Sequence, residues 1–196
     1  MENRLTRAII FDLDGTLLNS LEDIADTANE VLKHYGFETY PLEMYNGFVG
    51  NGLFELVKRI MPETTDEFTR LQGVAEFEKR YRKNWNRKTI PYPHIGEMLQ
   101  ALADRNILIS ILSNKADSFT NKCARHFFPE CNITPVIGLS EEIRPKPYAD
   151  GALIIAEKLQ ILPENFMFVG DSNIDIQTGI SAGMKTVGVG WGFRGE

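Results

Sequence analysis

The hydrophobic and polar positions of the chain follow two different patterns. Between about residues 20 and 88, apolar residues recur at the three- and four-residue spacing of amphipathic helices, with no strand pattern. After residue 90, short apolar runs typical of buried strands alternate with helical spacing, and one more such run stands at residues 8–11. The pattern therefore predicts an α/β protein whose first strand is separated from the others by a helical insertion.

Strands and helices that alternate in this way imply right-handed crossovers and a parallel sheet with helices on both faces. We therefore expect a Rossmann-like core formed by residues 1–17 and 89–196, with a small all-helical domain, residues 18–88, inserted after the first strand. In chain order, the expected elements are a strand at 8–11, helices near 21–35, 53–60 and 67–85, helix 95–102, strand 107–112, helix 118–128, strand 135–138, helix 149–159, strand 166–169, helix 174–182 and strand 186–189.

The longest of these helices has a recognisable start. Thr64, with Glu67 three residues later, matches a capping box, in which two side chains satisfy free backbone N–H groups at a helix N-terminus. The apolar stripe expected to face the interior consists of Phe68, Leu71, Val74 or Ala75, Phe77, Tyr81 and Trp85.

Three of the predicted strands run directly into short polar clusters. In an open parallel sheet, ligands bind outside the carboxyl ends of the strands, so these clusters are expected to share one edge. Lys146, in a proline-stiffened loop after the 135–138 strand, belongs to the same edge. The clusters are Asp12-Leu13-Asp14-Gly15-Thr16, Ser113-Asn114-Lys115 and Gly170-Asp171-Ser172.

The chemistry of these clusters favours a magnesium site. Asp12 and Asp14 would repel one another, and such an arrangement makes sense mainly when a cation or a shared proton lies between them. Oxygen ligands without histidine or cysteine suit Mg²⁺, which is usually held by one or two carboxylates together with a substrate phosphate. The ammonium of Lys146 suits a phosphate oxygen.

Each of these residues also has a purely structural interpretation. Asp12 and Asp14 can serve as a capping and a turn residue, and Lys146 can be a solvated surface lysine. Ser172 and Asp175 fit a capping box, although Asp175 lies one helical turn from Asp171 and can face the same metal or its waters. Thr16 and Ser113 can be turn or capping residues. A purely structural role is credible for any one of these residues. It is not credible that all of them, at three strand ends, have only structural roles.

Composition narrows the classes of partner. The chain has 196 residues, 43% of them hydrophobic, which suits one domain with a small insertion and a sizeable core. The net charge of −6 argues against a nucleic-acid partner. Cys123 and Cys131 match no metal-ligand spacing, and no apolar run is long enough for a membrane span. The N-terminus lacks the apolar core of a signal peptide, so a cytoplasmic protein is expected.

Taken together, the motifs resemble those of the haloacid dehalogenase (HAD) superfamily of phosphatases, and within it the phosphoglycolate phosphatase group. The resemblance covers nearly the whole chain, and it implies that residues 18–88 form the cap domain of that family. The four motifs stand in order as Asp12-Leu13-Asp14-Gly15-Thr16-Leu17, Ser113 with Asn114, Lys146, and Gly170-Asp171-Ser172 with Asp175.

The resemblance implies a role for each motif residue. Asp12 would attack phosphorus and form an aspartyl-phosphate, while Asp14 would protonate the leaving oxygen and then activate water. Magnesium would be held by the side chains of Asp12 and Asp171 and the backbone carbonyl of Asp14. Ser172 and Asp175 would hold the metal ligands in place without binding the metal directly. The residues expected to bind phosphate are Thr16, Ser113, Asn114 and Lys146.

Substrate choice is expected to depend on the helical insertion, because the core site recognises only phosphate. Gly50 and Asn51 resemble the loop of that family's cap that faces the active site, although a simple interhelical turn explains them equally well. Hinges near residues 15–19 and 88–93 would let the cap close and exclude water.

We therefore predict a magnesium-dependent phosphatase for a small phosphorylated metabolite, with phosphoglycolate the leading substrate, acting as a monomer or homodimer. A sugar phosphomutase, a pyrophosphatase or a nucleotide phosphatase would use the same scaffold. A non-catalytic phosphate-binding protein is a further alternative, but such proteins normally lack one of the catalytic aspartates, and Asp12, Asp14 and Asp171 are all present.

Overall fold

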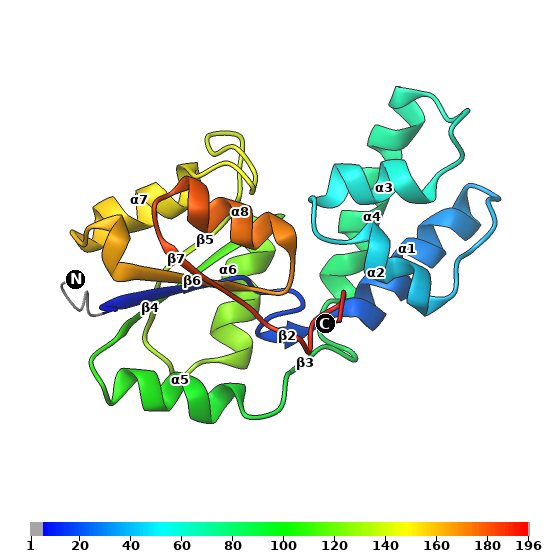
Figure 1. The fold of residues 1–196 in the computed structure, drawn as a ribbon. Helices are drawn as coiled ribbons and strands as arrows, with labels where there is room; N and C mark the ends of the chain where they lie inside the picture. The colour runs from blue at the N-terminus through cyan, green and yellow to red at the C-terminus, as the bar shows by residue number, and fades with distance from the viewer. Residues whose placement is uncertain (1–5, 196) are drawn as a thin grey trace.

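A five-stranded parallel sheet organises the protein (Figure 1). The computed structural model describes residues 6–195. The strand order is β5-β4-β1-β6-β7, so β1, the first strand of the chain, lies in the centre between β4 and β6. The strands of this sheet are β1 (Ala8–Phe11), β4 (Leu108–Ala116), β5 (Ile133–Leu139), β6 (Phe166–Gly170) and β7 (Lys185–Gly188). The predicted parallel α/β core is confirmed.

Helices cover both faces of the sheet. On one face, α5 (Ile95–Ala103) and α6 (Asp117–Phe127) pack on side chains such as Phe11 and Ile111. On the other, α7 (Asp150–Leu159) contacts β4 and β5, and α8 (Asn173–Ser181) contacts β6 and β7. Consecutive residues of β1 point to opposite faces, and all four are buried because both faces are covered.

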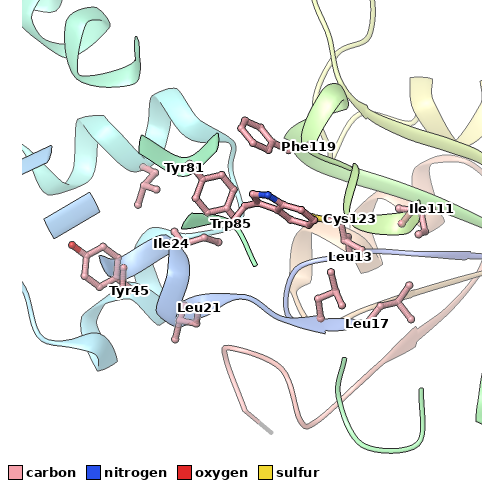
Figure 2. Packing of buried hydrophobic residues seen from close by; sticks show 14 of the residues in the cluster. Leu13, Leu17, Leu21, Ile24, Tyr45, Tyr81, Trp85, Ile111, Phe119 and Cys123 are labelled. Carbon is pink, nitrogen blue, oxygen red and sulfur yellow. The ribbon is translucent and has the colours of Figure 1, made fainter. Parts of the chain in front are cut away.

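Four α-helices lie between β1 and α5 in the chain and gather at one end of the sheet (Figure 1). They are α1 (Leu21–His34), α2 (Tyr45–Phe48), α3 (Leu53–Ile60) and α4 (Glu67–Asn84), with a short 3₁₀ turn at Leu42–Met44. We call these helices, together with the loops between them and the C-cap residue Trp85, the helical segment. Its buried residues form one continuous cluster with those under α5 and α6, and Figure 2 shows Tyr81 and Trp85 of this segment lying near Phe119 and Cys123 of α6.

A two-stranded antiparallel ribbon joins the helical segment to the core. It pairs β2 (Leu18–Asn19) with β3 (Ile90–Pro91), so the two connections lie side by side. The buried carboxylate of Asp23 on α1 fixes the returning connection, because it accepts the backbone N–H groups of Lys88 and Thr89 and the Thr89 hydroxyl at 2.7–3.1 Å. This ribbon was missed by the sequence analysis, since two-residue strands leave no periodic pattern.

The structure corrects two local predictions. The N-cap of α4 is Asp66, whose carboxylate accepts the backbone N–H of Thr69 at 2.9 Å, so the capping box predicted at Thr64 and Glu67 is wrong. In the predicted stripe, the residues from Phe77 onward are buried. Phe68, near the N-terminus of the helix, is 71% exposed. Among residues 6–195, no helix combines the length and apolar character needed to cross a membrane.

Candidate active site

The predicted polar clusters meet beyond the carboxyl ends of the central strands. Asp12 follows β1, Asp171 follows β6, and Ser113 and Asn114 lie near the end of β4. The backbone N–H of Asp12 donates to the carbonyl of Val169 at 2.9 Å, which fixes the start of the first cluster against the neighbouring strand. The convergence follows from the position of β1 between β4 and β6 in a parallel sheet.

Lys146 lies among the carboxylates that the sequence analysis assigned to the site. Its ammonium is 2.8 Å from Asp12 Oδ1 and 2.6 Å from Asp175 Oδ1, and the lysine side chain is only 3% exposed. The second oxygen of Asp175 accepts the hydroxyl and the backbone N–H of Ser172, which confirms the capping box at the start of α8. One oxygen of Asp175 therefore holds Lys146 in place, and the other stabilises the start of α8.

The carboxylates are crowded and largely buried. Burial raises the pKa of Asp12 to about 8; Lys146 opposes this shift, while Asp175 and Asp171 add to it. Burial also raises the pKa of Asp171, and the backbone N–H of Phe193, 2.9 Å from its Oδ2, opposes the change. The protein on its own therefore does not neutralise all of the negative charge collected here.

This charge and geometry fit a bound divalent cation. Carboxylate oxygens of Asp12, Asp171 and Asp175 lie within 4.8 Å of one another. Because Asp175 uses both of its oxygens for Lys146 and Ser172, Asp12 and Asp171 are the carboxylates best able to bind metal. Oxygen donors of this kind suit Mg²⁺. The site is narrow at this point, since a Cβ atom at Gly15 or Gly192 would collide with the Asp171 side chain.

Asp14 has a separate set of partners on the other side of the site. Its Oδ1 accepts the Ser20 hydroxyl at 2.6 Å, and both carboxylate oxygens accept hydrogen bonds from the Lys115 ammonium at 3.0–3.1 Å. The same ammonium donates to the hydroxyl of Tyr81 on α4 at 2.9 Å. Burial alone would favour the neutral amine, but Asp14 beside it raises the pKa of Lys115 above its ordinary value.

Asn114 connects three parts of the site. Its Oδ1 accepts the backbone N–H of Lys146 at 2.8 Å, and its amide donates to the carbonyls of Lys146 and Gly50. Asn114 therefore fixes the loop that carries the buried lysine and touches the loop before α3. Ser113 is 4% exposed, and together with Asn114 it lines a pocket that Asp12 and Asp14 also line.

A pocket lies between the core and the helical segment. The polar side is formed by Asp12, Asp14, Ser113, Asn114 and Lys115, and the loop at residues 49–52 contributes Gly50 and Gly52. The remaining wall is mainly apolar and comes largely from the helical segment. It consists of Ile24, Val49, Leu53, Leu56, Phe77, Tyr81, Ala116 and Phe119.

Six predicted site residues do not line this pocket: Lys146, Asp171, Ser172 and Asp175, whose contacts are given above, and Thr16 and Asn51. Thr16 is buried and its hydroxyl has no hydrogen-bond partner among residues 6–195. Asn51 directs its Oδ1 to Arg59, 2.7 Å away, and so stabilises the loop that contains it. The roles of Thr16 and Asn51 in binding substrate stay predictions.

Lys115 was part of a predicted polar cluster but was given no role, and Tyr81 was not among the predicted site residues. The strand was expected to end at Leu112, whereas β4 continues to Ala116, so that Ser113 and Lys115 keep the two-residue alternation of a strand. That alternation was the available signal for Lys115. Tyr81 had no such signal, because its predicted place in the α4 stripe is equally consistent with an ordinary core residue.

Comparison with known proteins agrees with the geometry. The model of a family described as "Haloacid dehalogenase-like hydrolase" matches residues 9–189, which span all four motifs. The chain belongs to this family. The predicted membership of the superfamily is therefore confirmed.

Relatives of this hydrolase carry a more specific name. A phosphoglycolate phosphatase of Aquifex aeolicus is 33% identical over 95% of this chain and 86% of its own length. One from Psychrobacter arcticus is 30% identical over 95% of this chain and 84% of its own. A crystal structure described as a "predicted phosphoglycolate phosphatase" from Haemophilus somnus superimposes with a TM-score of 0.90 at 26% identity, covering 98% of this chain and 88% of that one. The predicted similarity to phosphoglycolate phosphatases is also confirmed.

Proposed function

We propose that the protein is a magnesium-dependent phosphatase that hydrolyses a small phosphorylated metabolite through an aspartyl-phosphate on Asp12. The observation that supports this most directly is the pairing of two catalytic carboxylates with two buried lysines at one sheet edge. Lys146 contacts Asp12, and Lys115 contacts Asp14, at 2.8–3.1 Å. A phosphate monoester resists an anionic nucleophile, so positive charge at this edge is what the reaction requires.

Asp12 is the proposed nucleophile. Its Oδ1 accepts the backbone N–H of Leu13 at 2.7 Å and contacts Lys146, which fixes the carboxylate in orientation. An oxygen of Asp12 attacks phosphorus, the bond from phosphorus to the leaving oxygen breaks, and the phosphoryl group is carried on Asp12. Water then attacks this phosphorus and releases inorganic phosphate. Two displacements replace one difficult step, as in other covalent mechanisms.

Asp14 is the proposed acid and base. It donates a proton to the leaving oxygen in the first step and accepts one from the attacking water in the second. Lys146 and Ser113 stabilise charge on the phosphate oxygens, and Asn114 fixes the backbone of the loop that carries Lys146.

Asp12 and Asp171, with the backbone carbonyl of Asp14, would hold the magnesium ion. When bound, the ion offsets the negative charge of the phosphate and the carboxylates. Asp175 keeps Lys146 in place, and the tight fit of Gly15 and Gly192 around Asp171 orients that carboxylate.

The helical segment is the proposed cap, with boundaries at the β2–β3 ribbon and therefore close to residues 18 and 88. Its apolar wall encloses the leaving group, whereas the core recognises the phosphate. The relatives named phosphoglycolate phosphatase make phosphoglycolate the leading substrate. We propose action in the cytoplasm on a free metabolite, with no part for nucleic acid.

Phosphate release from phosphoglycolate tests this function. We expect release that requires Mg²⁺, stops with EDTA, and falls by more than about 10³-fold in Asp12→Asn, because the nucleophile is lost. Asp104→Asn, a change at an exposed aspartate, is the matched control and should keep full activity. Activity that survives in Asp12→Asn would contradict the covalent mechanism.

A panel of esters separates the alternatives on the same scaffold. Sugar phosphates that are isomerised without release of phosphate would indicate a phosphomutase. Preference for pyrophosphate or for nucleotides would indicate the other two hydrolases. Binding of phosphate without turnover of any ester would indicate a non-catalytic protein.

A further inference from the structure

The mechanism so far uses Lys115 only as a source of positive charge beside Asp14, and it gives Tyr81 no role. Lys115 is a buried lysine, 8% exposed in its side chain, with its ammonium 3.0–3.1 Å from both oxygens of Asp14. Tyr81 accepts a hydrogen bond from the same ammonium at 2.9 Å and lies under it, with the charge 4.7 Å from the ring centroid. An ammonium has three donors, and these contacts use all of them.

Lys115 differs from Lys146 in its environment. Lys146 lies between Asp12 and Asp175, where the phosphate is expected to bind, whereas Lys115 lies on the side of the site that faces the helical segment. Each of the two catalytic carboxylates thus has its own buried lysine. A buried ammonium is held in such a place only when its partners are fixed, because removing it from water is costly.

Tyr81 brings the helical segment into this arrangement. It belongs to α4, while Asp14 and Lys115 belong to the core. The tyrosine is 2% exposed, stacks on Phe77 at a centroid distance of 5.3 Å, and meets Phe119 of α6 edge-on at 5.1 Å (Figure 2). Its hydroxyl therefore reaches Lys115 from a position that the packing of α4 against α6 determines.

We propose that Lys115 and Tyr81 are positioning residues that hold the Asp14 carboxylate toward the leaving group, so that the packing of α4 on the core completes the catalytic arrangement. The inference rests on the proposed function, in which Asp14 protonates the leaving oxygen. Ser20 holds the same carboxylate from the start of α1. Asp14 is thus oriented from both ends of the helical segment.

Comparing the rates for esters whose leaving groups differ in basicity shows whether a general acid is correctly placed. An alkyl alkoxide is a strong base and needs a proton as it departs, whereas p-nitrophenolate departs without one. Correctly placed general acids contribute about 10²–10⁴-fold. A displaced Asp14 should therefore slow the cleavage of phosphoglycolate far more than that of p-nitrophenyl phosphate.

The experiment measures kcat/KM for both esters in the full-length protein with Mg²⁺, since this constant reports the steps through departure of the leaving group. Lys115→Met should lower the value for phosphoglycolate by about 10²-fold and that for p-nitrophenyl phosphate by less than about threefold. Tyr81→Phe, which keeps the ring and its packing, should lower the phosphoglycolate value by about threefold to tenfold, as expected for one lost hydrogen bond. Adding Tyr81→Phe to Lys115→Met should cause no further loss, because the two residues act through one contact.

Two variants serve as controls, one for the loss of a buried hydroxyl and one, at an exposed position, for the change of a lysine to methionine. Tyr45→Phe removes a buried hydroxyl that donates to Asn29 at 2.8 Å, away from the pocket lining, and Lys122→Met removes an ammonium stacked on Trp85. Both should leave the two rates unchanged. If Lys115→Met fails to fold, Tyr81→Phe alone decides.

Equal losses on the two esters, or none in Tyr81→Phe, would overturn the inference while leaving the phosphatase intact. A wild-type protein that cleaves neither ester would instead overturn the proposed function, and this inference with it.

Discussion

The two sides of the pocket are built in different ways. The side proposed to bind phosphate, here called the phosphate side, consists of polar and charged groups at the ends of strands of one sheet, and Lys146, fixed by Asp175 and Asn114, contacts Asp12 of this side. The side proposed to enclose the leaving group, here called the leaving-group side, is a mainly apolar wall that comes from helices packed against that sheet. The first side is determined by backbone topology, and the second by how the side chains of separate helices pack together.

Because of this difference, we expect the rate of phosphoryl transfer and the selectivity between substrates to depend on opposite sides of the pocket. A change on the phosphate side should affect every ester alike, because all of them share the phosphoryl group. A change on the apolar wall should affect esters according to the size and polarity of the leaving group. The predictions below test this separation.

After loss of the proposed nucleophile itself, loss of Lys146 should have the largest effect. Lys146→Met should lower kcat by about 10²–10³-fold, because a fixed charge near the transferred phosphoryl group is removed. The loss should be similar for phosphoglycolate and for p-nitrophenyl phosphate, in contrast to the expected result for Lys115→Met. Lys158→Met, at an exposed lysine of α7, is the matched control. A loss confined to one ester would contradict the separation of the two sides.

Magnesium should stabilise the protein through the phosphate side alone. At a concentration about 100 times its dissociation constant, the ion should add about 2.7 kcal/mol to the free energy of unfolding. This corresponds to a rise of several degrees in melting temperature, which a thermal melt with and without EDTA measures.

The melts also identify the ligands. Asp12→Asn should raise the melting temperature without Mg²⁺, because it removes one of the crowded carboxylates, and should reduce the gain on adding the ion. Leu53→Ala, on the apolar wall, should keep the full gain. An unchanged gain in Asp12→Asn would exclude that carboxylate as a metal ligand.

The sequence predicted the phosphate side better than the leaving-group side for a physical reason. Asp12, Asp171 and Lys146 stand at strand ends or in a loop that a parallel sheet must bring together, so their meeting follows from topology. The contact of Tyr81 with Lys115 depends on the packing of α4 against α6, which no local spacing encodes.

The connections between the helical segment and the core were not predicted from the sequence either. Strand and helix positions were predicted from periodicity, but the β2–β3 ribbon was not, because its strands have two residues each. The burial of Asp23 also went unrecognised, since on sequence alone an aspartate in the first turn of a helix is an ordinary surface residue.

Asp23 should matter for stability more than for chemistry. Asp23→Asn removes the charge that accepts hydrogen bonds from Lys88 and Thr89, and should lower the free energy of unfolding by about 1–3 kcal/mol. Denaturant unfolding measures this, and hydrogen exchange at the two amides should rise. Asp26→Asn is the control, because the exposed ion pair of Asp26 with Lys88 should contribute no more than about 1 kcal/mol. Equal effects in the two variants would mean that the buried contacts do not anchor the connection.

A change on the apolar wall should be the mildest and the most selective. Leu53 lines the pocket from the first turn of α3 and is only half-buried, so Leu53→Ala should leave the fold intact. Loss of its contacts should change the ratio of kcat/KM for a small and a bulky phosphate ester by about tenfold in favour of the bulky one, since a few methylene groups in a pocket contribute about 1–3 kcal/mol.

The matched control for this change is Leu71→Ala on α4, where the leucine is 51% exposed and outside the pocket lining. It should leave the ratio unchanged. If Leu53→Ala instead lowered the rates for both esters by the same factor, the wall would be contributing to the phosphoryl transfer itself. Selectivity would then have to lie closer to Asp14, at the contact between Lys115 and Tyr81.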